Sequence, residues 1–231
     1  NEGGLGVKVE LAGADRRDQI SLEINNLVIA GWAARDAEAQ EHYIRELEEL
    51  GVKRPTTTPT FYRVSAHRLT TAPAIECSGD ASSGEAETVI FAANGRLYVG
   101  LGSDHTDREV EAYGITVSKQ MCDKPIAREV WAFDDVAPHW DKLILRSWLT
   151  RDGERALYQE GTVANLLNPQ DVIARFTGGA ALPDGTALFG GTTPAIGGIR
   201  PGERFEGELE DPVLSRTLRL SYDVIPLPVM G

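Results

Sequence analysis

Alternating apolar and polar positions recur along the chain and predict a protein built mainly from β-strands. The run from Ile20 to Gly31 alternates in this way, and shorter runs of the same kind follow it. Successive side chains of a strand point to opposite faces, so such runs give strands with one buried face. The further predicted strands cover residues 61–64, 73–77, 85–91, 96–101, 142–149, 155–160, 204–210 and 216–224.

A smaller number of segments have helical periodicity. Apolar residues recur every three or four positions over residues 33–50, and Gly51 stands where a helix commonly ends. A second helix is predicted for residues 107–118, and a third begins after Asn168, which precedes a proline and an early acidic residue. Strands with a few inserted helices indicate the α+β class, and residues 1–231 suit one domain.

Charge and composition exclude some functions. The formal net charge is −12, whereas a nucleic-acid surface needs clustered Lys and Arg, so no nucleic-acid partner is expected. No apolar run approaches the roughly 20 residues of a membrane span, so we expect no membrane partner and a cytoplasmic protein. The two cysteines, Cys77 and Cys122, lie far apart in sequence; we interpret them as structural thiols, with one disulfide as the alternative.

Three acidic residues form the main candidate site. Glu85 and Glu87 lie two apart in a predicted strand, so their side chains share one face at a separation of roughly 6–7 Å. Asp104 follows the next predicted strand, after a turn at residues 93–96. Oxygen donors without Cys or clustered His suit a hard divalent cation such as Mg²⁺ or Mn²⁺. The alternative is a solvated acidic hairpin face.

Several motifs resemble the fumarylacetoacetate hydrolase family. Glu85-x-Glu87 and residues 103–111 resemble its metal-site signature, and three later segments resemble its Gly-x-Thr, Gly-Thr-Pro-Ala-Gly and Pro-Gly-Asp elements: residues 159–167, 189–195 and 199–203. The matches keep their order from about Arg35 to Tyr222. The resemblance implies a mixed β-roll, a homodimer, a small-molecule substrate and a metal ion held by Glu85, Glu87 and Asp104. Mg²⁺ is the expected ion, with Mn²⁺ or Ca²⁺ as alternatives.

The proton-transfer group is expected to be a histidine. His42 and Glu46 lie one helical turn apart, which suits a base oriented by a carboxylate. The resemblance implies a His-x-x-Glu pair on a lid helix, although here the acid falls one position later. His67 is the second candidate for the base. His105 is expected to support the metal site, and His139 to be structural.

The resemblance also implies substrate contacts. Lys124 lies twenty positions after Asp104, where the family has a lysine that reaches the substrate, with Lys119 as the alternative. Thr193 precedes a proline, as does a substrate-binding threonine of the family.

Two departures from the family pattern bear on specificity. Arg63 stands where the family has Lys and could clamp a carboxylate or carbonyl. Glu111 replaces the usual Gln, which favours a ureide, amide or hydroxyl-bearing substrate if its side chain faces the site. The alternative is that Glu111 points into solvent.

The predicted function is a divalent-metal-dependent hydrolase of a small dicarbonyl or keto-acid-like metabolite. Carbon–carbon cleavage would pass through a metal-bound enolate, with water activated by His42. The alternatives are a decarboxylase, hydratase or tautomerase, and a hydrolase or lyase of C–N bonds. A non-catalytic metal- or metabolite-binding protein is the alternative from outside the enzymes.

Overall fold

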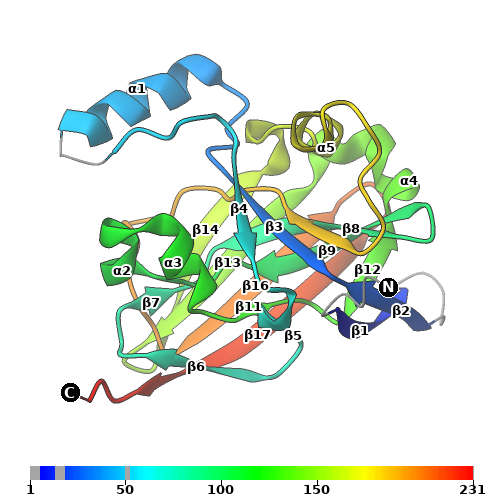
Figure 1. Cartoon of the computed structure of the whole chain (residues 1–231). Coiled ribbons are helices and arrows are strands. Elements are labelled where there is room, and N and C mark those ends of the chain that lie inside the picture. Colours follow the sequence, from blue (N-terminus) through cyan, green and yellow to red (C-terminus); the bar gives the residue numbers. More distant parts are fainter. Residues whose placement is uncertain (1–5, 14–18, 50–52, 231) are drawn as a thin grey trace.

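The computed structural model describes residues 6–13, 19–49 and 53–230, and its main element is a curled sheet (Figure 1). Within these residues the sheet has eight strands, in the order β2, β1, β12, β9, β8, β15, β3 and β4. Their bounds are β1 Val7–Gly13, β2 Gln19–Ile24, β3 Asn26–Gly31, β4 Thr60–Val64, β8 Ala86–Ala93, β9 Arg96–Ser103, β12 Glu129–Ala132 and β15 Thr186–Phe189.

A second sheet packs against this one and has the order β14, β13, β16, β17 and β6. These strands are β6 Ala74–Ser78, β13 Ile144–Arg151, β14 Glu154–Thr162, β16 Arg204–Asp211 and β17 Arg216–Leu227. Two short pairs join β10 to β7 and β11 to β5. Their bounds are β5 Leu69–Thr70, β7 Ser82–Ser83, β10 Thr106–Asp107 and β11 Lys124–Pro125.

The helices are short and lie around the sheets. They are α1 Ala37–Glu49, α2 Arg108–Tyr113, α3 Ile115–Gln120, α4 Phe133–Val136 and α5 Pro169–Thr177, with 3₁₀ turns η1 Ala66–Arg68, η2 Ala137–Lys142 and η3 Val163–Asn165. Helix α1 extends away from the sheets, whereas α2 and α3 lie together on the other side of strand β4 from α5 (Figure 1). The predicted α+β class, with strands and a few short helices, is confirmed.

The two faces of the eight-stranded sheet contribute to different hydrophobic clusters. Alternate residues such as Ile90 and Leu101 pack against the five-stranded sheet, together with Phe205 and Tyr222. The other face carries a second hydrophobic cluster, which includes Val89 of β8 and Ile29 of β3. Strand β8 is therefore buried on both faces, so its polar residues face protein on either side.

Two predicted elements differ from the observed ones because the chain changes partners. The strand predicted over Ile20–Gly31 is divided at Asn25, since β2 pairs with β1 whereas β3 pairs with β15 and β4. The helix predicted over residues 107–118 is divided at Gly114, whose backbone is extended.

The predicted first helix begins later than expected. Asp36 Oδ1 accepts from the backbone N–H groups of Glu38 and Ala39, so helix α1 begins at Ala37 rather than at residue 33. Its predicted end at Gly51 lies outside the described residues. Among the helices of the described residues, none is long and apolar enough to cross a membrane.

The two cysteines come together in space although 45 positions separate them in sequence. Cys77 lies on β6 and Cys122 follows α3, and both side chains are buried free thiols. A hydrogen bond between the two side chains lowers the pKa of Cys77 and raises that of Cys122. The interpretation as structural thiols in the reduced form agrees with this packing.

Candidate metal centre

Three carboxylates meet at the open end of the hairpin, where strand β8 begins and strand β9 ends. Glu87 lies opposite Gly102 in the ladder, and the backbone N–H of Asp104 donates to Glu85 O at 3.0 Å. This register places all three acidic side chains on one face of the hairpin, as the alternation of strand residues requires. One oxygen from each of Glu85, Glu87 and Asp104 lies within 4.8 Å of the other two. This "carboxylate cluster" could hold a metal ion.

A glycine-rich loop holds Glu87 in place. The backbone N–H of Gly191 donates to Glu87 Oε2 at 2.9 Å. Gly191 has φ +93°, and a Cβ atom there would stand 3.2 Å from Ala33 Cβ, so a side chain would disturb this approach. The loop thus joins the cluster to the segment that follows strand β3.

The electrostatic environment differs among the carboxylates of the cluster. Burial and the nearby charges of Asp104 and Glu85 raise the pKa of Glu87 well above its usual range. Burial opposes the ionisation of Asp104, but the charges of Lys119 and Lys124 outweigh it and lower the pKa of that carboxyl. A buried group of carboxylates with only oxygen donors fits a hard divalent ion such as Mg²⁺, Mn²⁺ or Ca²⁺.

Lys119, the alternative of the two predicted lysines, lies at the cluster. Its ammonium donates to Asp104 Oδ2, and the charges of Asp104 and Glu85 overcome burial and raise its pKa. Helix α3 carries this residue, and α3 packs beside strand β4.

Lys124 has a different environment from the one expected. It is completely buried and donates to the backbone carbonyls of His105, Lys119 and Cys122. Its Nζ lies 3.6 Å from Asp104 Oδ1. Because three carbonyls share its three N–H groups, its hydrogen bonds hold the backbone around Asp104. A substrate contact by Lys124 stays a prediction, and these hydrogen bonds give the side chain a structural role as well.

Arg108 links Glu111 to the cluster. Its Nη2 lies 3.1 Å from Glu85 Oε1, and its Nη1 donates to Glu111 Oε2 at 3.0 Å. Glu111 therefore neither points freely into solvent nor presents an unpaired carboxylate to the cluster. Burial opposes the charge of Arg108, but Glu85 and Glu111 together raise its pKa. Sequence reasoning did not give Arg108 a role, although it stands within the quoted signature.

Gln159 organises the strand that carries the two glutamates. Its Oε1 accepts from the backbone N–H of Ala86 at 3.0 Å, between Glu85 and Glu87. Its Nε2 donates to Thr192 Oγ1 and Thr193 O, both at 2.7 Å. Thr193 is buried, and within the described residues its Oγ1 has no hydrogen-bond partner. Buried hydroxyls are usually hydrogen-bonded, so this one is a candidate partner for a ligand.

The histidines take different positions. His42 and His67 are exposed, on α1 and η1 respectively, and the side chain of Glu46 lies outside the described residues. His105 is buried, with Nδ1 2.9 Å from Tyr222 Oη and Nε2 2.8 Å from Ser82 Oγ. His105 thus supports the backbone next to Asp104. His139 pairs with buried Asp211 at 2.9 Å, far along the chain from the cluster.

Arg63 points away from the carboxylate cluster. It pairs in register with Val28, and its Nη2 donates to Asn26 Oδ1 at 2.6 Å, at the opposite end of β3 from Gly31. Alternation along β4 instead places the neighbouring Tyr62 on the face that carries the cluster. A substrate clamp by Arg63 stays a prediction, and Tyr62 is the residue of β4 that shares the face of the cluster.

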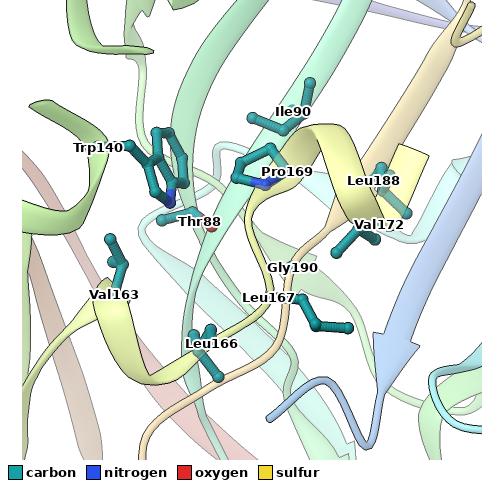
Figure 2. A pocket seen from close by; sticks show the side chains of 10 residues that line it. All are labelled: Thr88, Ile90, Trp140, Val163, Leu166, Leu167, Pro169, Val172, Leu188 and Gly190. Atoms are coloured by element: carbon teal, nitrogen blue, oxygen red, sulfur yellow. The ribbon is translucent and has the colours of Figure 1, made fainter. Parts of the chain in front are cut away.

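A small cavity lies on the other face of strand β8 (Figure 2). Thr88 and Ile90 line it from the strand, and Trp140, Pro169 and Val172 line it from η2 and α5. Its walls carry no titratable side chain, so it has no means of acid–base or metal chemistry. Of the two faces of β8 at this point, only the one that holds Glu87 therefore offers groups for acid–base or metal chemistry.

Solved structures share this fold at low sequence identity. A yeast protein, ynq8, described as a fumarylacetoacetate hydrolase family protein, has a TM-score of 0.63 and 15% identity, over 90% of this chain and 95% of that one. A 2-keto-3-deoxy-D-arabinonate dehydratase complexed with magnesium and 2,5-dioxopentanoate has a TM-score of 0.60 and 15% identity, over 93% and 78%. The predicted resemblance is thus confirmed for the fold.

A decarboxylase is among the similar structures as well. The 4-oxalocrotonate decarboxylase from Pseudomonas putida G7, complexed with calcium and acetate, has a TM-score of 0.56 and 17% identity, over 86% of this chain and 76% of that one. No curated protein matches the chain in sequence. The model of a family described as "Protein of unknown function (DUF2848)" matches residues 30–222. The chain therefore belongs to the DUF2848 family and has the fold of the fumarylacetoacetate hydrolase family.

Proposed function

We propose that this protein is a divalent-metal-dependent hydrolase or lyase of a small dicarbonyl or keto-acid-like metabolite. The supporting observation is the carboxylate cluster, whose three oxygens lie within 4.8 Å of one another beside the ammonium of Lys119. The similar structures include a dehydratase with magnesium and a decarboxylase with calcium. Carbon–carbon hydrolysis is the first candidate reaction; decarboxylation, hydration and tautomerisation follow, since the fold does not choose among them.

The side chains at the cluster would have different roles. Glu85, Glu87 and Asp104 would hold Mg²⁺, with Mn²⁺ or Ca²⁺ as alternatives. The bound ion would supply Lewis-acid polarisation of the substrate carbonyl. Lys119 would hold a negative oxygen of the substrate close to Asp104, and the buried hydroxyl of Thr193 would donate a second hydrogen bond.

Water activation is assigned to His42. Histidine is the side chain that most often serves as a general base, because a ring nitrogen can accept a proton from water. His42 is carried by α1, which extends away from the sheets, so its base role requires this helix to approach the cluster during turnover (Figure 1). His67, exposed on η1, is the second candidate.

Glu111 gives less support to C–N cleavage than its residue type suggested. Its carboxylate already accepts from Arg108, so it is not an unpaired acceptor for a ureide or amide N–H. Substrates for carbon–carbon and carbon–oxygen cleavage should therefore be tested before substrates for C–N cleavage.

A non-catalytic metal- or metabolite-binding protein is the second candidate. One observation favours it. His105 follows Asp104 directly, and both of its ring nitrogens already make hydrogen bonds, so this histidine is not free to accept a proton from water. Turnover of any metabolite that depends on His42 would exclude this candidate.

The direct test is calorimetry with oxalate, a dianion that chelates hard ions through two oxygens. We expect oxalate to bind in Mg²⁺ and not in EDTA, and Asp104→Asn to abolish that binding. A panel of dicarbonyl and 2-oxo acids is then screened for turnover in Mg²⁺. Oxalate binding that is equal in EDTA would refute the proposal.

A further inference from the structure

We propose that Trp32 and Tyr62 form an aromatic wall beside the carboxylate cluster, which selects substrates with an aromatic ring next to their chelating oxygens. This inference rests on the proposed function, because the oxygens of the substrate must first be held at the cluster. Trp32 and Tyr62 are each half-buried, so part of each ring remains accessible.

Tyr62 lies on the correct face of the sheet. It belongs to the same hydrophobic cluster as Val89 and Phe91, which continue the row begun by Glu85 and Glu87 on strand β8. Its ring rests directly on strand β3, where a Cβ atom on Gly31 would stand 2.7 Å from Tyr62 Cε2. The absence of a side chain at Gly31 thus lets the ring approach the backbone closely.

Two independent contacts connect this wall to the cluster. The Nζ of Lys119 lies 5.8 Å from the centre of the Tyr62 ring and also donates to Asp104. On the other side, Gly191 packs against Ala33, next to Trp32, and donates its N–H to Glu87. The wall therefore borders the cluster from strands β3 and β4.

Trp32 is held in an unusual backbone conformation. Its φ is +58°, in the left-handed region that a bulky residue rarely adopts. Its Nε1 donates to Tyr62 Oη across 3.4 Å, which sets the two aromatic side chains beside each other. Backbone strain of this kind persists where the surrounding structure requires it, commonly at ligand sites. Asn or Gly would occupy this conformation at lower cost, so the indole ring itself is the feature to explain.

The chemistry of the neighbouring groups defines the ligand. The cluster and Lys119 suit two adjacent oxygens, as in a 2-oxo carboxylate, while Tyr62 offers a ring within reach of the same lysine. Aromatic pairs gain affinity beyond the burial of their area, whereas an aliphatic group of equal size does not. We therefore infer an aryl-substituted 2-oxo acid, or a dicarbonyl compound of the same shape, as the substrate class.

Three 2-oxo acids test this inference by calorimetry in Mg²⁺: pyruvate, 4-methyl-2-oxopentanoate and phenylpyruvate. They share one chelating group and differ only in the substituent. We expect phenylpyruvate to bind about fivefold more tightly than 4-methyl-2-oxopentanoate. Tyr62→Leu and Trp32→Leu, which keep an apolar side chain, should each reduce this ratio below about twofold.

Phe61→Leu is the matched control. Phe61 is the neighbour of Tyr62 on the same strand but lies on the opposite face, where the centre of its ring is 5.2 Å from that of Phe176. It should leave the ratio unchanged. Equal affinities for phenylpyruvate and the aliphatic acid in the unsubstituted protein would overturn the aromatic wall, while oxalate binding would still support the proposed function. If the unsubstituted protein did not bind oxalate in Mg²⁺, the proposed function itself would be rejected.

Discussion

Lys119 and Asp104 form a nearly inaccessible ion pair, with 7% and 1% of their side chains exposed. The ammonium therefore competes with any metal ion for this carboxylate. We predict that Lys119→Met raises the affinity for Mg²⁺ about tenfold, a change of about 1.4 kcal/mol. The same variant should weaken oxalate binding, since it removes the cation that would hold the ligand. Titration calorimetry measures both, and Lys142→Met, an exposed lysine, is the control. An unchanged Mg²⁺ affinity in Lys119→Met would contradict the prediction.

Lys124 should act on stability more than on ligands. Its removal leaves three buried carbonyl groups without their donor, and each such group costs about 1–3 kcal/mol. Lys124→Met should therefore lower the free energy of unfolding by about 3 kcal/mol or more. Urea unfolding at pH 7 measures this quantity. A variant with unchanged stability but lost oxalate binding would restore Lys124 as a substrate contact.

Glu87 should destabilise the metal-free protein at neutral pH. Burial and the neighbouring carboxylates raise its folded pKa above its unfolded value of about 4.3. The cost of ionisation thus appears above the unfolded pKa and grows until pH passes the folded pKa. In EDTA at pH 7, Glu87→Gln should raise the Tm by a few °C, and the gain should vanish below about pH 4.

Mg²⁺ should affect the Tm of the unsubstituted protein and that of Glu87→Gln differently. It should raise the Tm of the unsubstituted protein and leave that of Glu87→Gln unchanged, because the variant lacks one of the three carboxylates. Thermal unfolding with and without Mg²⁺ gives both comparisons. A lower Tm of Glu87→Gln in EDTA would show that the carboxylate is stabilised by groups other than a metal.

The assignment of His42 as the base predicts a selective kinetic defect. With a substrate found in the metabolite screen, His42→Ala should reduce kcat about 100-fold or more and leave Mg²⁺ affinity unchanged. His67→Ala, also exposed, is the comparison. If His67→Ala has the larger effect on kcat, the two assignments must be exchanged.

Asp211 provides a pH-dependent test of the fold away from the cluster. Burial raises the pKa of its carboxyl, but hydrogen bonds from His139, Leu214 N–H and Arg216 outweigh burial and lower it. A lowered folded pKa stabilises the protein above the unfolded pKa of about 3.9, and the benefit is lost as pH falls through the folded pKa.

The corresponding variant is Asp211→Asn. It should cost about 3 kcal/mol at pH 7 and progressively less below pH 4. Urea unfolding over this pH range measures the difference from the unsubstituted protein. A loss that is equal at pH 7 and pH 3 would contradict the electrostatic origin of the effect.

The sequence predicted most strands, because their side chains alternate between a core and a more polar face. The sequence predicted strands β13 and β14 and the helix start after Asn168 from local signals alone. Strand β15, although fully buried, was missed, because a short apolar run has no alternation to detect. The pairing of Cys77 with Cys122 depends on tertiary packing and carries no local signal.

The candidate site was predictable only in part. Glu85, Glu87 and Asp104 follow from strand spacing and the adjoining turn, so their proximity could be inferred. The choice between Lys119 and Lys124 depends on how α3 lies against β4, which spacing alone does not give. Arg63 and Tyr62 show the same limit: one residue of register decides which side chain faces the cluster.

Titration with Mn²⁺, followed by electron paramagnetic resonance of the free ion, is the decisive test of the proposed metal site. We predict one bound Mn²⁺ per chain. In Glu85→Gln and Asp104→Asn the affinity for Mn²⁺ should be at least about 100-fold weaker, because each variant removes one of three charged ligands. A protein that binds no Mn²⁺, or an Asp104→Asn variant that binds it as tightly as the unsubstituted chain, would contradict the account.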